Sequence, residues 1–185
     1  MPPEIPLPKT ANAVSPDIIS LCKKIAPGQR AVYLKIEPIA HSIVNECYEN
    51  VARAIKQKGG TIQHGWQLWE TMPGVMAEAE FHATWRDADG NLHDITPKEA
   101  PGITEILFLP DPSKIYSGRQ IDNIRLALKD DPLVHAFIKT SESYFEVTNR
   151  GELANYYGEL IATPEMEKIM QQKDELLVTI IQKFY

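Results

Sequence analysis

The sequence predicts an α+β fold in which a helix packs on a small antiparallel sheet and further helices follow. Segments that alternate apolar and polar residues lie between Ala31 and Leu109, and this period of two is typical of strands. Segments with helical spacing flank that region. A chain of 185 residues with 43% hydrophobic residues is long enough to bury a core of its own. Clustered strands followed by helices are typical of the α+β class.

We expect three parts within one domain. Residues 1–15 contain four prolines and no hydrophobic period, which predicts an irregular arm. Residues 16–110 hold the expected strands and form the α+β core. Residues 111–185 are expected to be a helical extension that packs on the same domain.

Two helices and a strand are expected before the main sheet. Ser15-Pro16-Asp17 has the composition of a helix start, and the helix that follows stops near Pro27-Gly28. Residues 31–36 alternate as a strand does. Residues 45–58 form the second helix, which the glycine pair 59–60 ends.

The middle of the chain predicts antiparallel strands joined by tight turns. Met72-Pro73-Gly74 separates the first two strands, and residues 87–91 form the turn of a hairpin. The expected strands of this region are residues 61–70, 75–86, 92–95 and 104–109. The last of these is apolar throughout, which predicts a buried strand.

Beyond Pro110 the sequence predicts helices. They are expected at residues 120–129, after Pro132, at 152–160 and at 164–184. The last helix carries a broad apolar stripe. We expect this stripe to dock on the protein's own core, and the alternative is a homodimer seam or a contact with a partner.

Charge and composition exclude several function classes. A net charge of −6 and a pI near 5.4, with no dense basic block, argue against a nucleic-acid or anionic-membrane binder. No apolar run approaches the ~20 residues needed to span a bilayer, and residues 1–10 lack the pattern of a secretory signal. Cys22 and Cys47 are therefore expected to be reduced thiols in a cytoplasmic protein, and no cofactor is expected.

Three residues can carry chemistry together: Cys47 near a helix start, His82 in a strand and Asp94 in the next strand. Asn45 is a good N-cap, which would place Cys47 in the first helical turn. Exposed N–H groups and the positive end of the helix dipole stabilise a thiolate there and lower the thiol pKa. Such a nucleophile needs an imidazole as its base, and the imidazole needs a carboxylate or amide to orient it.

The hairpin register decides whether His82 and Asp94 can meet. A two-residue turn at Asp89-Gly90 would point them to opposite faces of the sheet. A three-residue loop, Ala88 to Gly90, would instead place Thr84 opposite Asp94 and make His82 its diagonal neighbour, ~7–8 Å away between Cα atoms. That distance allows a hydrogen bond between their side chains.

The same residues resemble a known group of enzymes. A cysteine at a helix start, then His82-Ala-Thr-Trp85 on a strand and Asp94-Ile-Thr-Pro97 on the next, is similar to the core of transglutaminase-like proteins, which belong to the papain-like superfamily of cysteine enzymes. The resemblance covers about residues 45–97. It implies a papain-like core and a Cys-His-Asp triad in which Cys47 attacks an amide of a peptide or protein substrate and forms a thioester. Water as acceptor would give hydrolysis or deamidation, and an amine would give transamidation.

Other residues are candidates for positions around this site. The backbone N–H of Cys47 is the first expected oxyanion donor, and Asn45 or Gln67 the second. One of Trp66 and Trp69 is expected to border the site. These tryptophans also lie at positions where core residues are common. Glu80 is expected on the same strand face as His82, where it would be solvated or would compete with Asp94 for the imidazole.

Three alternatives stay open. Cys47 lies on an apolar helix face, where an inert buried cysteine would occupy the same place. The chain would then be a catalytically inactive papain-like fold that acts as a protein-interaction module. A zinc site with His64 or His93 as a fourth ligand is the remaining alternative, although no close pair of metal ligands supports it. Cys22 is expected in the core.

Overall fold

The computed structural model describes residues 6–156 and 158–185. Residues 1–5 of the expected arm lie outside the described residues. The elements are β1 (Lys9–Thr10), α1 (Pro16–Ile25), β2 (Val32–Lys35), α2 (Cys47–Lys58), β3 (Thr61–Met72), β4 (Met76–Arg86), β5 (Leu92–His93), β6 (Glu105–Pro110), β7 (Ile124–Ala127), α3 (Pro132–Thr148), η1 (Gly151–Asn155) and α4 (Pro164–Phe184). The α+β class is confirmed.

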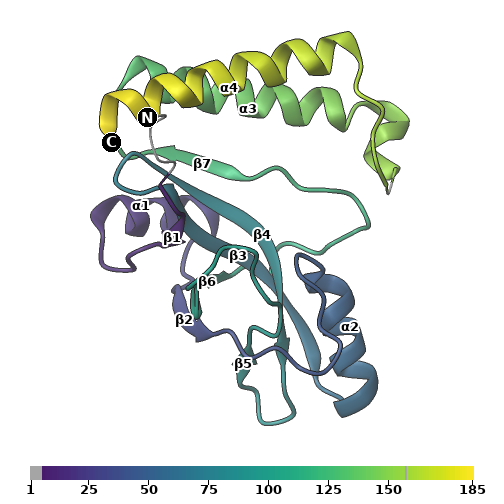
Figure 1. Ribbon diagram of the computed structural model, residues 1–185. Coiled ribbons are helices and arrows are strands. Elements are labelled where there is room, and N and C mark those ends of the chain that lie inside the picture. Colours follow the sequence, from purple (N-terminus) through teal and green to yellow (C-terminus); the bar gives the residue numbers. More distant parts are fainter. Residues whose placement is uncertain (1–5, 157) are drawn as a thin grey trace.

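An open antiparallel sheet forms the centre of the molecule (Figure 1). Its order is β2-β6-β3-β4-β5, with β1 paired to the end of β3 and β7 paired to the beginning of β4. The prediction of a wholly irregular arm is therefore wrong at Lys9–Thr10, which adds a short strand beside Trp69 and Glu70. The long strands β3 and β4 form the middle of the sheet, as the alternation of apolar and polar residues along them predicts.

The outer edge of β4 determines where the site lies. β7 pairs with residues 76–79 of this strand, and β5 pairs with residues 85–86. Helix α2 packs on β4 (Figure 1), and Val51 and Ala54 of α2 contact Ala83 and Ile95. The N-terminus of α2 is thereby held close to the middle of β4.

The two faces of the sheet are covered differently. On one face α1 buries Ile18 and Leu21 against Trp66 and Leu68 of β3. On the other face Trp69 and the β6 residues Ile106 and Phe108 form a smaller cluster. This second face is the one that carries Gln67, Glu80 and His82, as the cross-strand register requires.

Two of the helices predicted after Pro110 are not formed. Residues 120–129 contain β7 because Ile124, Leu126 and Leu128 pack on the core beside β4, whose outer edge needs a partner. The described residues of 152–160, which leave out 157, contain only the 3₁₀ helix η1, and Gly158 has a φ of 145° that a helix cannot accommodate. Tertiary pairing here overrides local helix preference.

Helices α3 and α4 form a hairpin along one end of the sheet (Figure 1). The Thr163 side chain caps α4 by accepting from the N–H of Met166. The apolar stripe of α4 docks on its own domain, where Ile180 packs against the β3–β4 hairpin and α3. Met170 and Val178 on another side of α4 are exposed. Among the described residues, none of the helices combines the length and apolar character that a membrane crossing requires.

Candidate active site

Cys47 is the first residue of α2 and lies in its first turn, as expected. The expected cap is wrong: Glu46 occupies the N-cap position, and its side chain makes no capping bond. Asn45 adopts a φ of 63°, a left-handed conformation that asparagine tolerates better than most residues. As the first helical residue, Cys47 has a backbone N–H without an acceptor inside the helix, and this N–H can donate to a substrate oxygen.

A buried asparagine fixes the loop before Cys47. Asn50 accepts a hydrogen bond from the Ile43 N–H at 2.9 Å and donates to the Ile43 carbonyl at 2.8 Å. It also donates to the Thr96 hydroxyl at 3.2 Å. Because Thr96 is two residues from Asp94, Asn50 connects the loop before Cys47 to the segment that carries Asp94.

We expect Asn50→Ala to destabilise the protein by about 2 kcal/mol, because the buried groups of Ile43 and Thr96 lose their partner. Urea denaturation of the variant against wild type measures this difference. Ala52→Ser on the exposed side of the same helix is the control and should change the free energy of unfolding by less than about 0.5 kcal/mol. Equal values for the two variants would contradict the role given to Asn50.

The hairpin between β4 and β5 has the three-residue loop. Trp85 pairs with His93 and Arg86 with Leu92, and Gly90 adopts a φ of 88°. This register makes His82 the diagonal neighbour of Asp94 across the sheet. The His82 Nε2 atom lies 3.1 Å from Asp94 Oδ1, and both side chains are buried.

Asp94 is held by three groups. Its Oδ1 atom contacts His82 and also accepts from the Thr96 N–H at 3.2 Å. Its Oδ2 atom forms an ion pair with Lys98 Nζ at 2.8 Å. Burial opposes ionisation, but the charges and hydrogen bonds of His82 and Lys98 outweigh it and lower the pKa of Asp94. The carboxylate is therefore ionised and accepts from His82 Nε2–H.

His82 lies between Asp94 and Cys47. Because Asp94 engages Nε2, Nδ1 is the ring nitrogen left for Cys47, which borders the same pocket and acts to raise the pKa of His82. Burial and the positive charge of Lys98 both lower the pKa of His82, but Asp94 and the hydrogen bond to Cys47 raise it to about 9. The structure thus joins the three residues that the sequence singled out.

This pKa predicts a pH dependence of stability. The folded-state pKa of His82 lies above the 6.5 of an ordinary histidine, so its stabilisation is fully present below pH 6.5 and is lost as pH rises toward 9. We expect the stability advantage of wild type over His82→Gln to shrink across this window. Urea denaturation at pH 6, 7.5 and 9 measures it, and an advantage that grows with pH would contradict the assignment.

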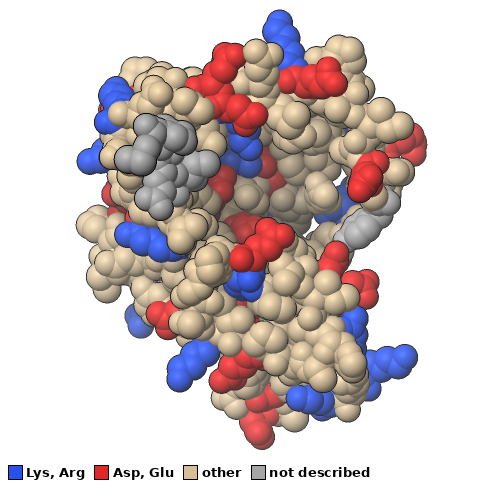
Figure 2. Space-filling model, in the orientation of Figure 1, with Lys and Arg blue, Asp and Glu red and all other residues tan. Residues whose placement is uncertain are grey.

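Cys47 borders two hollows. A pocket of about 200 Å³ lies on the sheet face beside His82, Gln67 and Trp69. A groove of about 510 Å³ extends from Cys47 toward the end of α3 and past η1, and Figure 2 shows the surface hollowed between the helical hairpin and α2. Cys47 is 6% exposed and packs with Val51, but it can be reached from both hollows.

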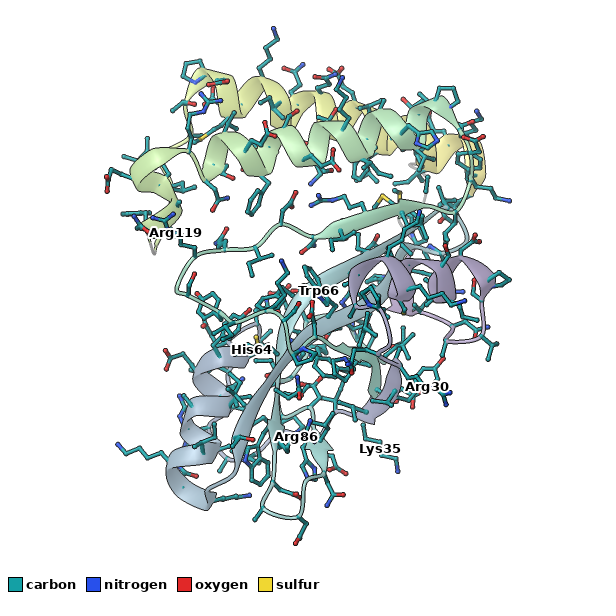
Figure 3. All side chains as sticks on the ribbon, turned by 180° about the vertical axis from the view of Figure 1, so that it is seen from behind. Arg30, Lys35, His64, Trp66, Arg86 and Arg119 are labelled. Carbon is teal, nitrogen blue, oxygen red and sulfur yellow. The ribbon has the colours of Figure 1, made fainter. Side chains whose placement is uncertain are left out.

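The other predicted site residues separate into two groups. Asn45, Gln67, Trp69 and Glu80 line the pocket with Cys47. Glu80 accepts hydrogen bonds from Gln67 at 3.3 Å and from the Trp69 indole at 3.1 Å, so it does not replace Asp94 at the imidazole. Trp66 does not belong to the site. It lies on the opposite face against α1 and donates to Asp111 at 3.0 Å (Figure 3).

The histidines weighed as zinc ligands lie elsewhere. The His64 ring stacks on Phe81 at 5.9 Å (Figure 3 labels His64), and His93 contacts Asp87 and Glu37. Across residues 6–156 and 158–185, no group of three or more His, Cys, Asp or Glu residues is placed to hold a metal ion. Cys22, a residue of α1, is buried in the hydrophobic core, as expected.

Sequence reasoning missed Lys98, Asn50 and Thr96. Lys98 follows Asp94 by four residues in an irregular segment, where no hydrophobic period marks it. Asn50 is a polar residue on the buried side of α2, which is a usable signal because helices seldom bury an unpartnered amide.

Comparison with known proteins found no matching family model, no similar curated protein and no similar solved structure. The function has to follow from the geometry of the site.

Proposed function

We propose that the protein is a cysteine-dependent amide hydrolase or acyl transferase that works through a Cys47–His82–Asp94 triad. The observation that carries this proposal is the buried His82, whose Nε2 atom lies 3.1 Å from Asp94 Oδ1 and whose ring borders the same pocket as Cys47. This is the arrangement that an activated thiol requires: a base within hydrogen-bond reach and a third group that orients the base. The resemblance to papain-like and transglutaminase-like enzymes supports the same arrangement.

The reaction proceeds in two halves. His82 holds the proton taken from Cys47, and the resulting thiolate forms a bond to the amide carbonyl carbon. His82 then donates that proton to the departing nitrogen, so the C–N bond breaks and a thioester remains on Cys47. In the second half a water molecule or a primary amine attacks the thioester, His82 accepts its proton and returns it to the sulfur, and the acid or new amide leaves.

The oxyanion of each tetrahedral intermediate needs donors beside Cys47. The Cys47 backbone N–H at the start of α2 is the first donor. For the second donor, Gln67 fits better than Asn45. The Gln67 amide nitrogen lies in the same pocket and has a second hydrogen beyond the one that it donates to Glu80. Asn45 borders the pocket as well, and it is the alternative second donor.

The size of the hollows supports a peptide or protein as substrate. The 510 Å³ groove extends past α3 and η1, and its volume is in the range of ligand-binding clefts, while the smaller pocket beside His82 is about 200 Å³. The helical extension 111–185 supplies much of the groove's wall, which gives it a part in selecting the substrate. We place the reaction in the cytoplasm, where both cysteines stay reduced.

Trapping of the thioester tests the proposal. The protein is incubated with peptides that contain glutamine, asparagine or a backbone amide of varied sequence, quenched in acid and analysed by intact mass and peptide mapping. We expect acyl adducts on Cys47 that amines or water discharge, and no adduct in Cys47→Ser. The inactive interaction module would bind peptides without forming an adduct, and this result would overturn the proposal.

A further inference from the structure

Lys98 occupies an unusual place for a lysine. Its side chain is only 9% exposed, and it lines the pocket that Cys47 and His82 also border. Lysine is rarely buried unless it is paired. Here its Nζ atom lies 2.8 Å from Asp94 Oδ2 and 2.7 Å from Gln67 Oε1, so one ammonium group contacts both the triad carboxylate and the side chain favoured as oxyanion donor.

The contact with Gln67 settles which way that amide points. An ammonium group has three donors and no acceptor, so the Gln67 group that faces it must be the oxygen. The Gln67 nitrogen is then on the side of Glu80, to which it donates at 3.3 Å. Lys98 therefore holds Gln67 in the orientation that offers N–H groups to the pocket.

The contact of Lys98 with Asp94 weakens the attraction between the Asp94 carboxylate and the protonated His82 ring. Asp94 Oδ1 faces His82 while Oδ2 faces Lys98, so the carboxylate divides its charge between two cations. Without the lysine, the buried carboxylate would hold the imidazolium more tightly. A general acid must release its proton to the leaving nitrogen, and a proton held too strongly slows this step.

We propose that Lys98 is a positioning residue of the site. It orients Gln67 for the oxyanion, and it weakens the electrostatic attraction of the Asp94 carboxylate for the protonated His82 ring. This inference rests on the proposed function. The charged and titratable groups that face His82 in the pocket are Cys47 from α2, Glu78 and Glu80 from β4, and Asp94, Lys98 and Glu99 from the segment after β5. Lys98 is the only cation in this set, and Glu78 is already paired with Arg125.

Four variants test the inference. Lys98→Gln removes the charge and keeps a donor, Lys98→Arg keeps the charge, and Lys56→Met removes an exposed charge from the helix that carries Cys47. Lys98→Met fills the same space without a charge and serves if Lys98→Gln does not fold. The readouts are the His82 titration followed by NMR of the labelled imidazole and the rate of Cys47 alkylation against pH.

We expect the His82 midpoint of Lys98→Gln or Lys98→Met to rise by about one pH unit, while Lys98→Arg and Lys56→Met stay near wild type. The alkaline limb of the alkylation profile should move with it. A purely structural lysine would lower stability and the alkylation rate at every pH without moving the midpoint, and this result overturns the inference. A shifted midpoint together with a Cys47 that forms no thioester in wild type would instead overturn the proposed function and leave the charge sharing established.

Discussion

An Asp94→Asn variant is expected to form the thioester about 10⁴-fold more slowly than wild type. Lys98 faces the Oδ2 position and can only donate to residue 94. Its charge outweighs the neutral Thr96 N–H, which donates to the Oδ1 position. The amide oxygen of the asparagine therefore turns toward Lys98 and its NH₂ group toward His82. His82 Nε2 must then accept, which moves the ring proton to Nδ1, the nitrogen that faces Cys47. A protonated Nδ1 on a neutral ring cannot take the proton of the thiol.

The rate of acyl adduct formation on Cys47, followed by mass spectrometry, measures the effect of Asp94→Asn. The variant should also titrate His82 well below the wild-type midpoint of about 9, because the carboxylate charge is gone. Asp111→Asn is the matched control, since Asp111 is a buried aspartate that bonds Trp66 on the other face of the sheet. A rate for Asp94→Asn within tenfold of wild type would contradict the role of Asp94.

Gly65→Ala is expected to destabilise the protein by at least about 3 kcal/mol. Gly65 lies in β3 directly opposite His82, between β4 and β6. A Cβ atom at this position would be 2.3 Å from the Leu109 carbonyl oxygen and 2.6 Å from the Phe108 ring. Neither the central strand nor a buried ring can yield easily. The missing side chain thus lets Phe108 pack close to the sheet face that carries His82, where its ring centroid lies 6.3 Å from that of His82.

Chemical denaturation measures this loss for Gly65→Ala. Gly102→Ala is the control: its Cβ would meet no atom within 4 Å, and its φ of 81° limits the cost to about 1 kcal/mol of backbone strain. Equal losses of unfolding free energy for the two substitutions would show that close packing over Gly65 does not stabilise this part of the sheet.

The register of the sheet shows how far the sequence predicts this site. The loop of Ala88 to Gly90 could be weighed from turn chemistry alone, and it places Asp94 beside His82. The pairing of β3 with β4 could not be predicted from turn chemistry alone. Next to the turn Met72 pairs with Met76, and that register continued along the strands would set Trp66 opposite His82. A bulge between Trp69 and Met72 shifts the pairing by one, so Gly65 takes that place and Trp66 turns to the other face.

Tertiary contacts account for the other differences. Residues 124–127 contain good helix formers, but the unpaired beginning of β4 recruits them as strand β7. Lys98 belongs to no periodic element, so only the folded chain reveals that its ammonium group reaches Asp94 and Gln67. Cys47, His82 and Asp94 could be singled out because a helix start and two strands have local signals, whereas the residues that contact them are brought there by long-range packing.

Alkylation of Cys47 against pH tests the central claim most directly. Iodoacetamide is applied to Cys22→Ala protein, with and without His82→Ala, and peptide mapping confirms which cysteine reacts. An ordinary thiol is only ~0.3% thiolate at pH 6. We expect fast alkylation of Cys47 at pH 6 and a rate about 100-fold lower once His82 is removed. No alkylation of Cys47 at any pH short of unfolding would contradict the account and show a buried structural cysteine.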